Sequence, residues 1–469
     1  MEYDDVAWEK DEGLYESWAE KVFEQEMLRE IGLFILDYRE GLPEELFPPK
    51  MGSFNILFRM KFRDGESILI RFPRTSSRFP EEKIKCEVAV MRFLEYHTSI
   101  RVPHVHHYGM TEQSPGKLGP FIIMDYFDCD HTLTPGLNTP SLSIEDRPIL
   151  DPNISEERLT SCYSQMADIL LELSKHDFNE IGCIKKENEE DKFDDSWIVA
   201  HRPWTFNMNE LIQMGNFPPD HLPPNTFKTA SSYYLALAEM HMLHLSTQHN
   251  DCVNSLADCR RKYIARCLFR RLAREGRLHD PRFENGPFRL FCDDFRPANV
   301  LSNKDFQIIA AIDWEYCYAA PSEFTYSPPF WLLLELPEYW PEGLEDWTKT
   351  YEKRLSTFLR AMELQEEAKI GRGVLKEHER LSAQMRRSWQ SGDFWVNYAA
   401  RKSWAFDMIY WAKIDRRFYG EGDMDDRLSL LTPTERAGMD AFVARKMDES
   451  RERVLIDWTK TDSKDFVVP

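Results

Sequence analysis

The sequence predicts an α+β fold of two lobes, in which a small lobe with an antiparallel sheet precedes a larger, mostly helical lobe. Strand-like runs flank an Asp-Gly turn and predict a hairpin over 52–74, because Asp-Gly favours a tight turn. A helix over 81–97 and a strand over 121–127 complete the small lobe. Beyond about 127 the apolar spacing is helical, apart from short strand-like runs that carry acidic residues.

The remaining elements follow from apolar periodicity and capping residues. Acidic and apolar residues at helical spacing predict an entry helix over 14–40. Residues 155–176 predict a helix with Ser155 as its N-cap. Residues 185–230 are polar and contain proline, which predicts loops or a cap, whereas 227–275 and 340–455 are helical.

These elements divide the chain into four parts. We expect an N-terminal helical extension over 1–50 and a small lobe over 51–127. The larger lobe, with a helical substrate cap, spans 128–455, and 456–469 form a tail.

Composition excludes several classes of protein. The 469 residues are 42% apolar and 13% aromatic, which is typical of a packed globular protein. Nine cysteines without a C-x-x-C pair predict reduced thiols in the cytoplasm, and the acidic N-terminus lacks the features of a secretory signal. No apolar run approaches the roughly 18 residues of a membrane span, and a net charge of −21 opposes nucleic-acid binding. Nothing in the sequence indicates an oligomeric state.

An acidic cluster within 291–316 is the strongest functional signal. "PFRLF" and "FQIIAAI" predict strands before Asp293 and Asp313, and "NVL" predicts the return of a hairpin. Asp294 and Asn299 then lie at the two ends of a tight loop, with Asp313 at the mouth of the adjacent strand. Carboxylate and amide oxygens that converge in this way suit Mg²⁺. The alternative is that Asp293 and Asp294 cap a turn and Asp313 is an ordinary acid at a strand end.

The D-x-x-x-x-N spacing, followed by an apolar strand and Ile-Asp, is the layout of phosphoryl transfer in the kinase fold. "CDDFRPANVL…AAIDWEY" resembles the H-x-D-x-x-x-x-N…I-D-W-E pattern of the aminoglycoside phosphotransferase and choline kinase-like superfamily, especially its branch in filamentous fungi. The resemblance covers about 50 to 420. It implies a protein kinase-like fold and transfer of the γ-phosphoryl group of ATP, with Mg²⁺, to a hydroxyl of a small molecule.

The resemblance also implies roles for single residues. It makes Asp294 the catalytic base, and Asn299 and Asp313 the Mg²⁺ ligands. Two positions depart from the pattern: Cys292 replaces the histidine and Asp293 replaces a glycine. Asp293 would raise the pKa of Asp294 or recruit a cation if it faced the site. We expect it instead to face solvent.

The nucleotide side of the site is predicted less directly. Kinase-like folds pair a cation on the third strand with a glutamate on the next helix, which here implies Arg71 and Glu87. Glu87 lies within an apolar stripe, where a charge is costly unless it is paired. The alternative is two unrelated surface charges.

Two backbone segments would contact the nucleotide. Gly52, Ser53 and Phe54 stand where a phosphate loop is expected, although a single glycine is a weak signal and otherwise means only a turn. Asp125 to Phe127 would form the hinge beside the adenine, and the alternative is an ordinary buried strand.

The acceptor cannot be read from the sequence. Aromatic residues and acids in 387–411 suit a cationic amine, but an aromatic stripe on a helix is more often core, and we expect core here. Cys292, Asp293 and the weak phosphate loop favour a rival, a nucleotide-binding pseudokinase that acts as a scaffold. A divergent protein kinase is a third possibility, against which the absence of D-F-G counts.

Overall fold

The small lobe is an antiparallel sheet. In the computed structural model, which describes residues 1–52, 55–74, 78–143, 145–188 and 195–458, its strand order is β1-β3-β4-β6-β5, with β2 beside β3. The expected hairpin over 52–74 is confirmed, since β3 and β4 pair from Asn55–Pro73 to Lys61–Ser67 and Gly65 adopts a φ of +94° at the turn. The strands are β1 (Pro43–Leu46), β2 (Lys50–Met51), β3 (Asn55–Phe62), β4 (Ser67–Pro73), β5 (Val105–Gly109) and β6 (Phe121–Asp125).

Both faces of this sheet are covered, which is why every residue of β4 is buried. Ile68, Ile70 and Phe72 pack against the N-terminal helices, whereas Leu69 belongs to the core that contains α3 (Pro80–His97). Side chains alternate along a strand, so Arg71 shares the α3 face with Leu69. The expected apolar stripe of α3 is confirmed as buried core.

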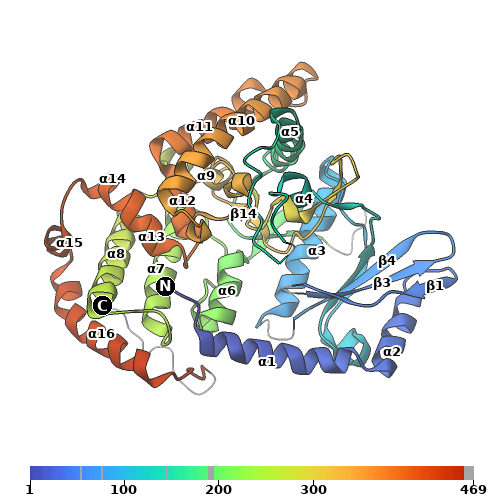
Figure 1. Cartoon of the computed structure of the whole chain (residues 1–469), viewed down its shortest axis with the longest axis horizontal. Helices are drawn as coiled ribbons and strands as arrows, with labels where there is room; N and C mark the ends of the chain where they lie inside the picture. The colour runs from blue at the N-terminus through green and yellow to red at the C-terminus, as the bar shows by residue number, and fades with distance from the viewer. Residues whose placement is uncertain (53–54, 75–77, 144, 189–194, 459–469) are drawn as a thin grey trace.

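The N-terminal helix spans the two lobes. The single helix expected over 14–40 is wrong: α1 (Asp5–Val22) and α2 (Gln25–Leu36) are separate, because the chain turns at Phe23 and Glu24. The far end of α1 packs Tyr15, Trp18 and Val22 against the sheet, and its near end lies beside α6. Figure 1 shows α1 running along the lower edge of the molecule between the two lobes.

The larger lobe is mostly helical, as expected. Ser155 caps α5 by accepting a hydrogen bond from the backbone N–H of Arg158. Residues 185–230, expected as loops or a cap, also form strand β10 and helix α6. The helices are α4 (Thr134–Leu137), α5 (Glu156–Leu173), α6 (Phe206–Met214), α7 (Ala230–Thr247), α8 (Leu256–Arg274), α9 (Ser322–Thr325), α10 (Leu344–Gly371), α11 (Leu381–Ser391), α12 (Asp393–Arg401), α13 (Phe406–Ile409), α14 (Asp415–Tyr419), α15 (Met424–Ser429) and α16 (Pro433–Glu452).

Three small sheets lie within this lobe, in the strand orders β14-β11-β8, β13-β12-β7 and β10-β9. The "NVL" segment does form a strand, but it pairs with β13 and β7 rather than with the strand before Asp293. The strands are β7 (His131–Thr132), β8 (Asp177–Phe178), β9 (Cys183–Lys186), β10 (Trp197–His201), β11 (Phe288–Cys292), β12 (Val300–Ser302), β13 (Ile308–Ala311) and β14 (Cys317–Ala320).

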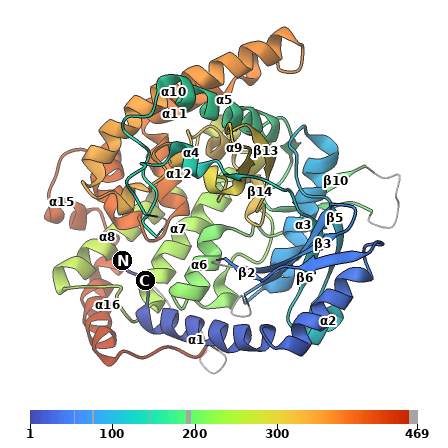
Figure 2. The same ribbon diagram turned by 45° about the vertical axis from the view of Figure 1, so that its right-hand side comes forward.

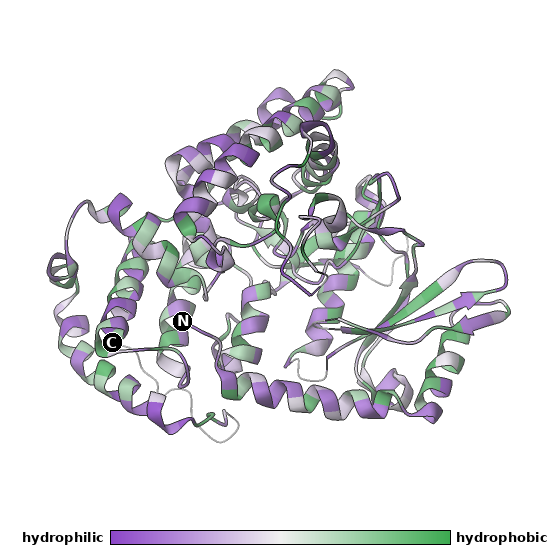
Figure 3. Cartoon of the chain, in the orientation of Figure 1, coloured by the Kyte–Doolittle hydropathy of each residue, from purple (hydrophilic) through white to green (hydrophobic). Residues whose placement is uncertain are grey.

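The predicted fold class is confirmed: an antiparallel sheet lobe precedes a mostly helical lobe, which is the element order expected of the protein kinase-like fold. Figure 3 shows hydrophilic and hydrophobic residues interleaved along the long helices. Within the described ranges, no helix has the length and apolar character needed to cross a membrane.

Candidate active site

Asp294 and Asn299 lie together in the loop after β11. The amide nitrogen of Asn299 donates to the backbone oxygen of Asp294 at 2.8 Å and to its Oδ2 at 3.1 Å. Arg296 Nε lies 2.9 Å from Asp294 Oδ1. The five-residue spacing therefore folds into a loop in which the amide holds the carboxylate.

Asp313 lies directly beside this loop. The N–H of Ile312 donates to the backbone oxygen of Asn299 at 2.9 Å, which fixes the end of β13 against the loop. Asp313 adopts a φ of +64°, a left-handed conformation that is unfavourable for residues other than glycine. Its Oδ1 lies 3.4 Å from Nη1 of Arg71, which comes from the sheet lobe.

Arg71 also forms a buried ion pair with Glu87 of α3, and Glu87 is only 1% exposed. Burial lowers the pKa of Arg71, but the carboxylates of Glu87, Asp313 and Glu315 outweigh it and raise the pKa. Burial raises the pKa of Glu87, and the charge of Arg71 opposes that change. The structure thus joins Arg71, Glu87 and Asp313 in one network between the lobes.

A second ion pair in this network was not expected from the sequence. Lys83 Nζ lies 2.8 Å from Glu315 Oε2, and each side chain is 1% exposed. The amide nitrogen of Asn55 donates to the same oxygen at 3.3 Å. Lys83 and Glu87 are four residues apart on α3 and therefore share one face of the helix. This spacing was the feature of the sequence that could have indicated Lys83 as a second cation beside the site.

The acidic side chains influence one another. Burial raises the pKa of Asp313 well above its ordinary value, and Glu315, Glu87 and Asp294 raise it further against the effect of Arg71. Burial also raises the pKa of Asp294, while Arg296, Lys402 and the Asn299 hydrogen bond lower it. Added positive charge beside Asp313 and Asp294 would therefore be favourable.

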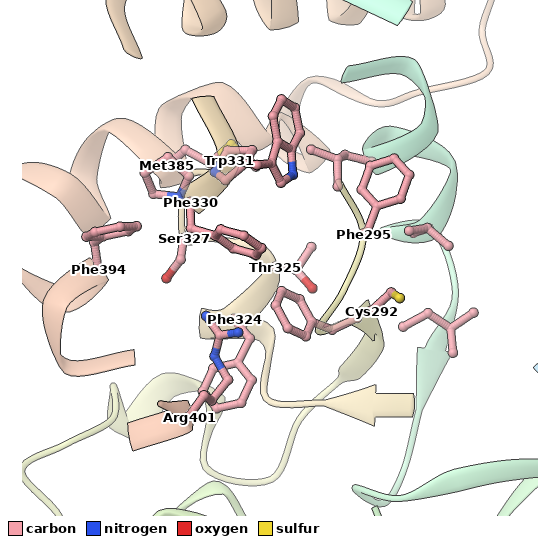
Figure 4. A pocket seen from close by; sticks show the side chains of 16 residues that line it. Cys292, Phe295, Phe324, Thr325, Ser327, Phe330, Trp331, Met385, Phe394 and Arg401 are labelled. Carbon is pink, nitrogen blue, oxygen red and sulfur yellow. The ribbon is translucent and has the colours of Figure 1, made fainter. Parts of the chain in front are cut away.

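Asp293 does not face solvent, so that expectation is wrong. It is 3% exposed, and Arg401 Nη1 lies 3.0 Å from its Oδ1. The Arg401 guanidinium lies over the rings of Phe291 and Phe324, at 4.6 and 4.8 Å from their centroids. Figure 4 shows Arg401 beside Phe324 at the edge of a small, mostly apolar cavity of about 40 Å³. Asp293 is buried because α12 brings it a cation.

Cys292, which stands at the histidine position of the resembling pattern, is also buried. It lies opposite Cys317 in the β11–β14 ladder, and the two thiols are in hydrogen-bonding contact. Burial raises the pKa of the Cys292 thiol well above its usual range. The residue therefore packs within the small sheet beneath the loop.

The predicted phosphate loop is described only in part. The N–H of Gly52 donates to the backbone oxygen of Asn55 at 2.8 Å, which closes the turn between β2 and β3. Ser53 and Phe54 lie outside the described residues. Asn55, which the sequence analysis did not select, connects this turn to Glu315.

Asp125 and Phe127 lie where β6 leaves the sheet. The backbone N–H of Asp125 donates to the oxygen of His104 at 3.0 Å, and its carboxylate lies 2.6 Å from His106 Nε2. The Arg101 guanidinium lies 4.6 Å from the centroid of the Phe127 ring. In the described structure neither side chain makes a hydrogen bond or ion pair with Asp294 or Asp313.

A second acidic group lies on the helical side of Asp294. Burial raises the pKa of Glu210 to about 7, and the charges of Glu338 and Asp294 contribute to the increase. The Tyr3 hydroxyl donates to Glu210 Oε1 at 3.2 Å and lies 3.1 Å from the Tyr339 hydroxyl. No pattern in the sequence indicated this group, because Tyr3, Glu210 and Tyr339 come from distant parts of the chain.

The predicted aromatic core is confirmed in part. Trp395, Tyr398 and Tyr410 are buried, whereas Trp404 and Trp411 are half-buried.

The described residues contain no group of three or more His, Cys, Asp or Glu side chains arranged to hold a metal ion. A metal site here would therefore depend on fewer protein ligands, as is usual for Mg²⁺.

No protein-family model matches the chain, and none of the curated proteins compared with it matches. Several solved structures are similar over most of its length. A putative fructosamine-3-kinase from Thermobifida fusca is 10% identical, with 89% of this chain and 98% of that chain covered and a TM-score of 0.39. The amicoumacin kinase hAmiN, in complex with AMP-PNP, Ca²⁺ and Ami, is 11% identical over 94% of this chain and 98% of its own, with a TM-score of 0.41.

A macrolide 2'-phosphotransferase type I is 12% identical, with 89% of this chain and 97% of that chain covered and a TM-score of 0.37. At TM-scores below 0.5 this likeness carries no argument about activity, so the function is inferred from the geometry above.

Proposed function

We propose that the chain is an ATP- and Mg²⁺-dependent phosphotransferase that moves the γ-phosphoryl group to a hydroxyl of a small molecule. The observation that carries the proposal is the cluster in which Asp294, Asn299 and Asp313 adjoin the Arg71–Glu87 ion pair. Phosphoryl transfer needs positioning and charge neutralisation more than covalent help from the protein. This cluster provides acids and a cation at one place between the lobes.

Asp294 is the proposed catalytic base. Its carboxylate is held by Asn299 and Arg296, so it has a fixed orientation toward an acceptor hydroxyl. Burial raises the pKa of Asp294 above the ordinary aspartate value, which makes its carboxylate a stronger proton acceptor. Asp294 would accept the hydroxyl proton as the acceptor oxygen bonds to the γ-phosphorus, while the bond between that phosphorus and the bridging oxygen breaks and ADP leaves with the electron pair.

Asn299 and Asp313 fit the proposed role of Mg²⁺ ligands. Asn299 makes both of its side-chain hydrogen bonds to Asp294 through its amide nitrogen. Its amide oxygen is therefore available as a ligand for a metal ion. Burial raises the pKa of Asp313, and the neighbouring Glu315 and Glu87 carboxylates raise it further, so a cation at this position would offset both effects. When bound, the ion would neutralise charge on the nucleotide phosphates.

The sheet lobe would hold the nucleotide. Arg71, oriented by Glu87, offers a guanidinium that binds phosphate oxygens in pairs. We further propose that the turn of Gly52, Ser53 and Phe54 covers the phosphates and that the backbone from Asp125 to Phe127 meets the base. In this scheme 51–127 binds the nucleotide and 128–455 binds the acceptor.

The metal assignment is tested by thermal unfolding with and without Mg²⁺ and AMP-PNP. We expect the ligands together to raise the Tm of the wild-type protein, and Asp313→Ala to abolish the increase. Asp305→Ala is the matched control, since Asp305 is an exposed acid in the turn before β13. An unchanged ligand-dependent increase in Asp313→Ala would refute the assignment of Asp313.

The second candidate function is a pseudokinase scaffold. The observation that favours it is the buried Asp293–Arg401 ion pair. This pair gives the loop after β11 a structural role directly beside the proposed base. A screen of sugars, amines and secondary metabolites for ATP-dependent phosphorylation, read by mass spectrometry, separates the two. Nucleotide binding without any phosphorylated product supports the scaffold.

A further inference from the structure

A groove of about 720 Å³ lies on the face of α3 that is turned away from the ion-pair network. It is bounded by α3, by β5 and by the β9–β10 hairpin, which Figure 2 shows on neighbouring parts of the molecule. Its basic and aromatic lining residues are Lys85, Arg92, Lys185, Lys186, Tyr108 and Trp197. We call it the α3 groove.

The groove gathers positive charge in a protein whose net charge is −21. Arg92 and Lys185 make no ion pair with any residue that the structure describes, and Lys85 lies 3.8 Å from Glu81 in an exposed pair that contributes little. Four basic side chains of the described chain therefore line one cavity in a protein that is acidic as a whole.

The two acids of the groove are already engaged with histidines. Glu95 Oε1 lies 2.8 Å from His104 Nδ1, and Asp195 Oδ1 lies 3.1 Å from His97 Nε2. Among the described residues, neither of these acids pairs with Arg92 or Lys185.

Aromatic rings form part of the wall. The Arg92 guanidinium lies 5.3 Å from the centroid of the Tyr108 ring, which holds the cation in place without neutralising it. Trp197 packs edge-on against Phe93 of α3, with 5.3 Å between ring centroids. The groove therefore combines fixed cations with apolar surface, and its volume lies in the usual range for small-molecule sites.

We propose that the α3 groove is a binding site for a small phosphate-bearing ligand, separate from the nucleotide cleft. Arginine and lysine side chains on one helix and one strand can bind several phosphate oxygens at once. The proposal does not depend on phosphotransferase activity, because none of the groove residues belongs to the proposed active site.

The groove and the active site share α3 but use opposite faces of it. Lys85, Ala89 and Arg92 recur at helical spacing on the groove side. Lys83 and Glu87 lie about half a turn away and point to Glu315 and Arg71. A ligand in the groove would therefore contact the helix that orients Arg71 without contacting Arg71 itself.

Inorganic pyrophosphate is a suitable probe. We expect calorimetric titration in EDTA to show binding to the wild-type chain that weakens as salt is raised. The double variant Arg92→Ala/Lys185→Ala should bind at least tenfold more weakly. Lys349→Ala/Lys353→Ala, which removes the same charge from the exposed face of α10, should bind as the wild type does.

Two results would overturn the proposal. One is the absence of pyrophosphate binding to the wild-type chain. The other is equal binding by both double variants, which would place the anion in the cleft or in no defined site. The single variant Lys185→Glu reverses one charge on β9 and tests the groove again if the double variant does not fold. Asp294→Asn should leave pyrophosphate binding unchanged, so failure of the groove and failure of the catalytic proposal can be told apart.

Discussion

Asp313 illustrates how much a single residue of this site is constrained. Its left-handed backbone costs on the order of 1–3 kcal/mol, and its carboxylate lies among three other acids. Contacts on both sides hold Asp313 in place. The N–H of Ile312 donates a hydrogen bond to the backbone oxygen of Asn299, and Arg71 of the sheet lobe lies beside the Asp313 carboxylate. Strain maintained by neighbours in this way is typical of functional positions.

Replacing Asp294 tests the proposed base directly. Asn keeps the size of the side chain but cannot accept a proton, so Asp294→Asn should retain nucleotide binding and lose about 10²–10⁴-fold in turnover. The measurement is kcat for the acceptor found by mass spectrometry, together with the Tm increase produced by AMP-PNP and Mg²⁺. Asp305→Asn should retain wild-type turnover. Normal turnover by Asp294→Asn would show that Asp294 is not the base.

The pH dependence of turnover offers a second test at this scale. A base must be ionised, so activity should rise with pH through the pKa of Asp294, which burial places above its ordinary value. Arg296 lowers that pKa, so Arg296→Gln should move the acidic limb of the kcat/KM profile to higher pH. Arg282→Gln, at an exposed arginine remote from Asp294, should leave the limb in place. A limb that does not respond to Arg296→Gln excludes Asp294 as its origin.

Among the elements, α3 shows most clearly what local sequence can reveal. Its length and apolar stripe followed from periodicity, because one face packs against the core. The hairpin before it and the cap of α5 likewise depend on neighbouring residues only. Strand β12 was assigned the wrong partner because pairing with β13 and β7 depends on distant parts of the chain.

Helices α5 and α10 lie side by side and are joined by a buried ion pair (Figure 1). Lys369 Nζ lies 2.7 Å from Glu172 Oε1. Although burial works in the opposite direction, Lys175 and Lys369 lower the pKa of Glu172 to about 2. Because this pKa is depressed, the pair stabilises the fold above the ordinary glutamate pKa and loses that effect as the pH falls toward 2.

Replacing Lys369 with an uncharged residue should destabilise the fold. We expect Lys369→Met to lower the free energy of unfolding by about 3 kcal/mol at pH 7, because Glu172 loses a buried partner. The exposed Lys353, on the same helix, provides the control. Lys353→Met should change the free energy of unfolding by less than about 0.5 kcal/mol. Urea unfolding measures both, and equal effects in the two variants would contradict this account.

For the whole molecule, the candidate active site is assembled from segments that are distant in sequence. The pairing of Arg71 with Glu87 was expected from the resemblance to kinase-like folds, and the same resemblance singled out Asp313. Lys83 and Asn55 were not selected, since only the closure of the sheet lobe onto β13 and β14 brings them to Glu315. The burial of Asp293 was missed for the same reason, because its partner comes from α12.

The Lys83–Glu315 pair connects the two lobes, and its coupling can be measured. Lys83→Met should destabilise the protein by about 3 kcal/mol and weaken AMP-PNP binding, since an unpaired Glu315 repels phosphate. Adding Glu315→Gln should restore part of the stability, with a coupling free energy of roughly 1–3 kcal/mol in a double-mutant cycle. Lys353→Met, on the exposed face of α10, is the control. Strictly additive effects would show that the two residues act independently.

Helix α1 limits how the two lobes can separate. Its 18 residues form a rod of about 27 Å whose near end is anchored where Asp4 accepts hydrogen bonds from Asn250, and whose far end is embedded under the sheet. Because α1 is attached to both lobes, the lobes cannot separate by simple translation. The lobes can therefore move relative to each other by a swivel about α1, in which the sheet rocks rather than lifts.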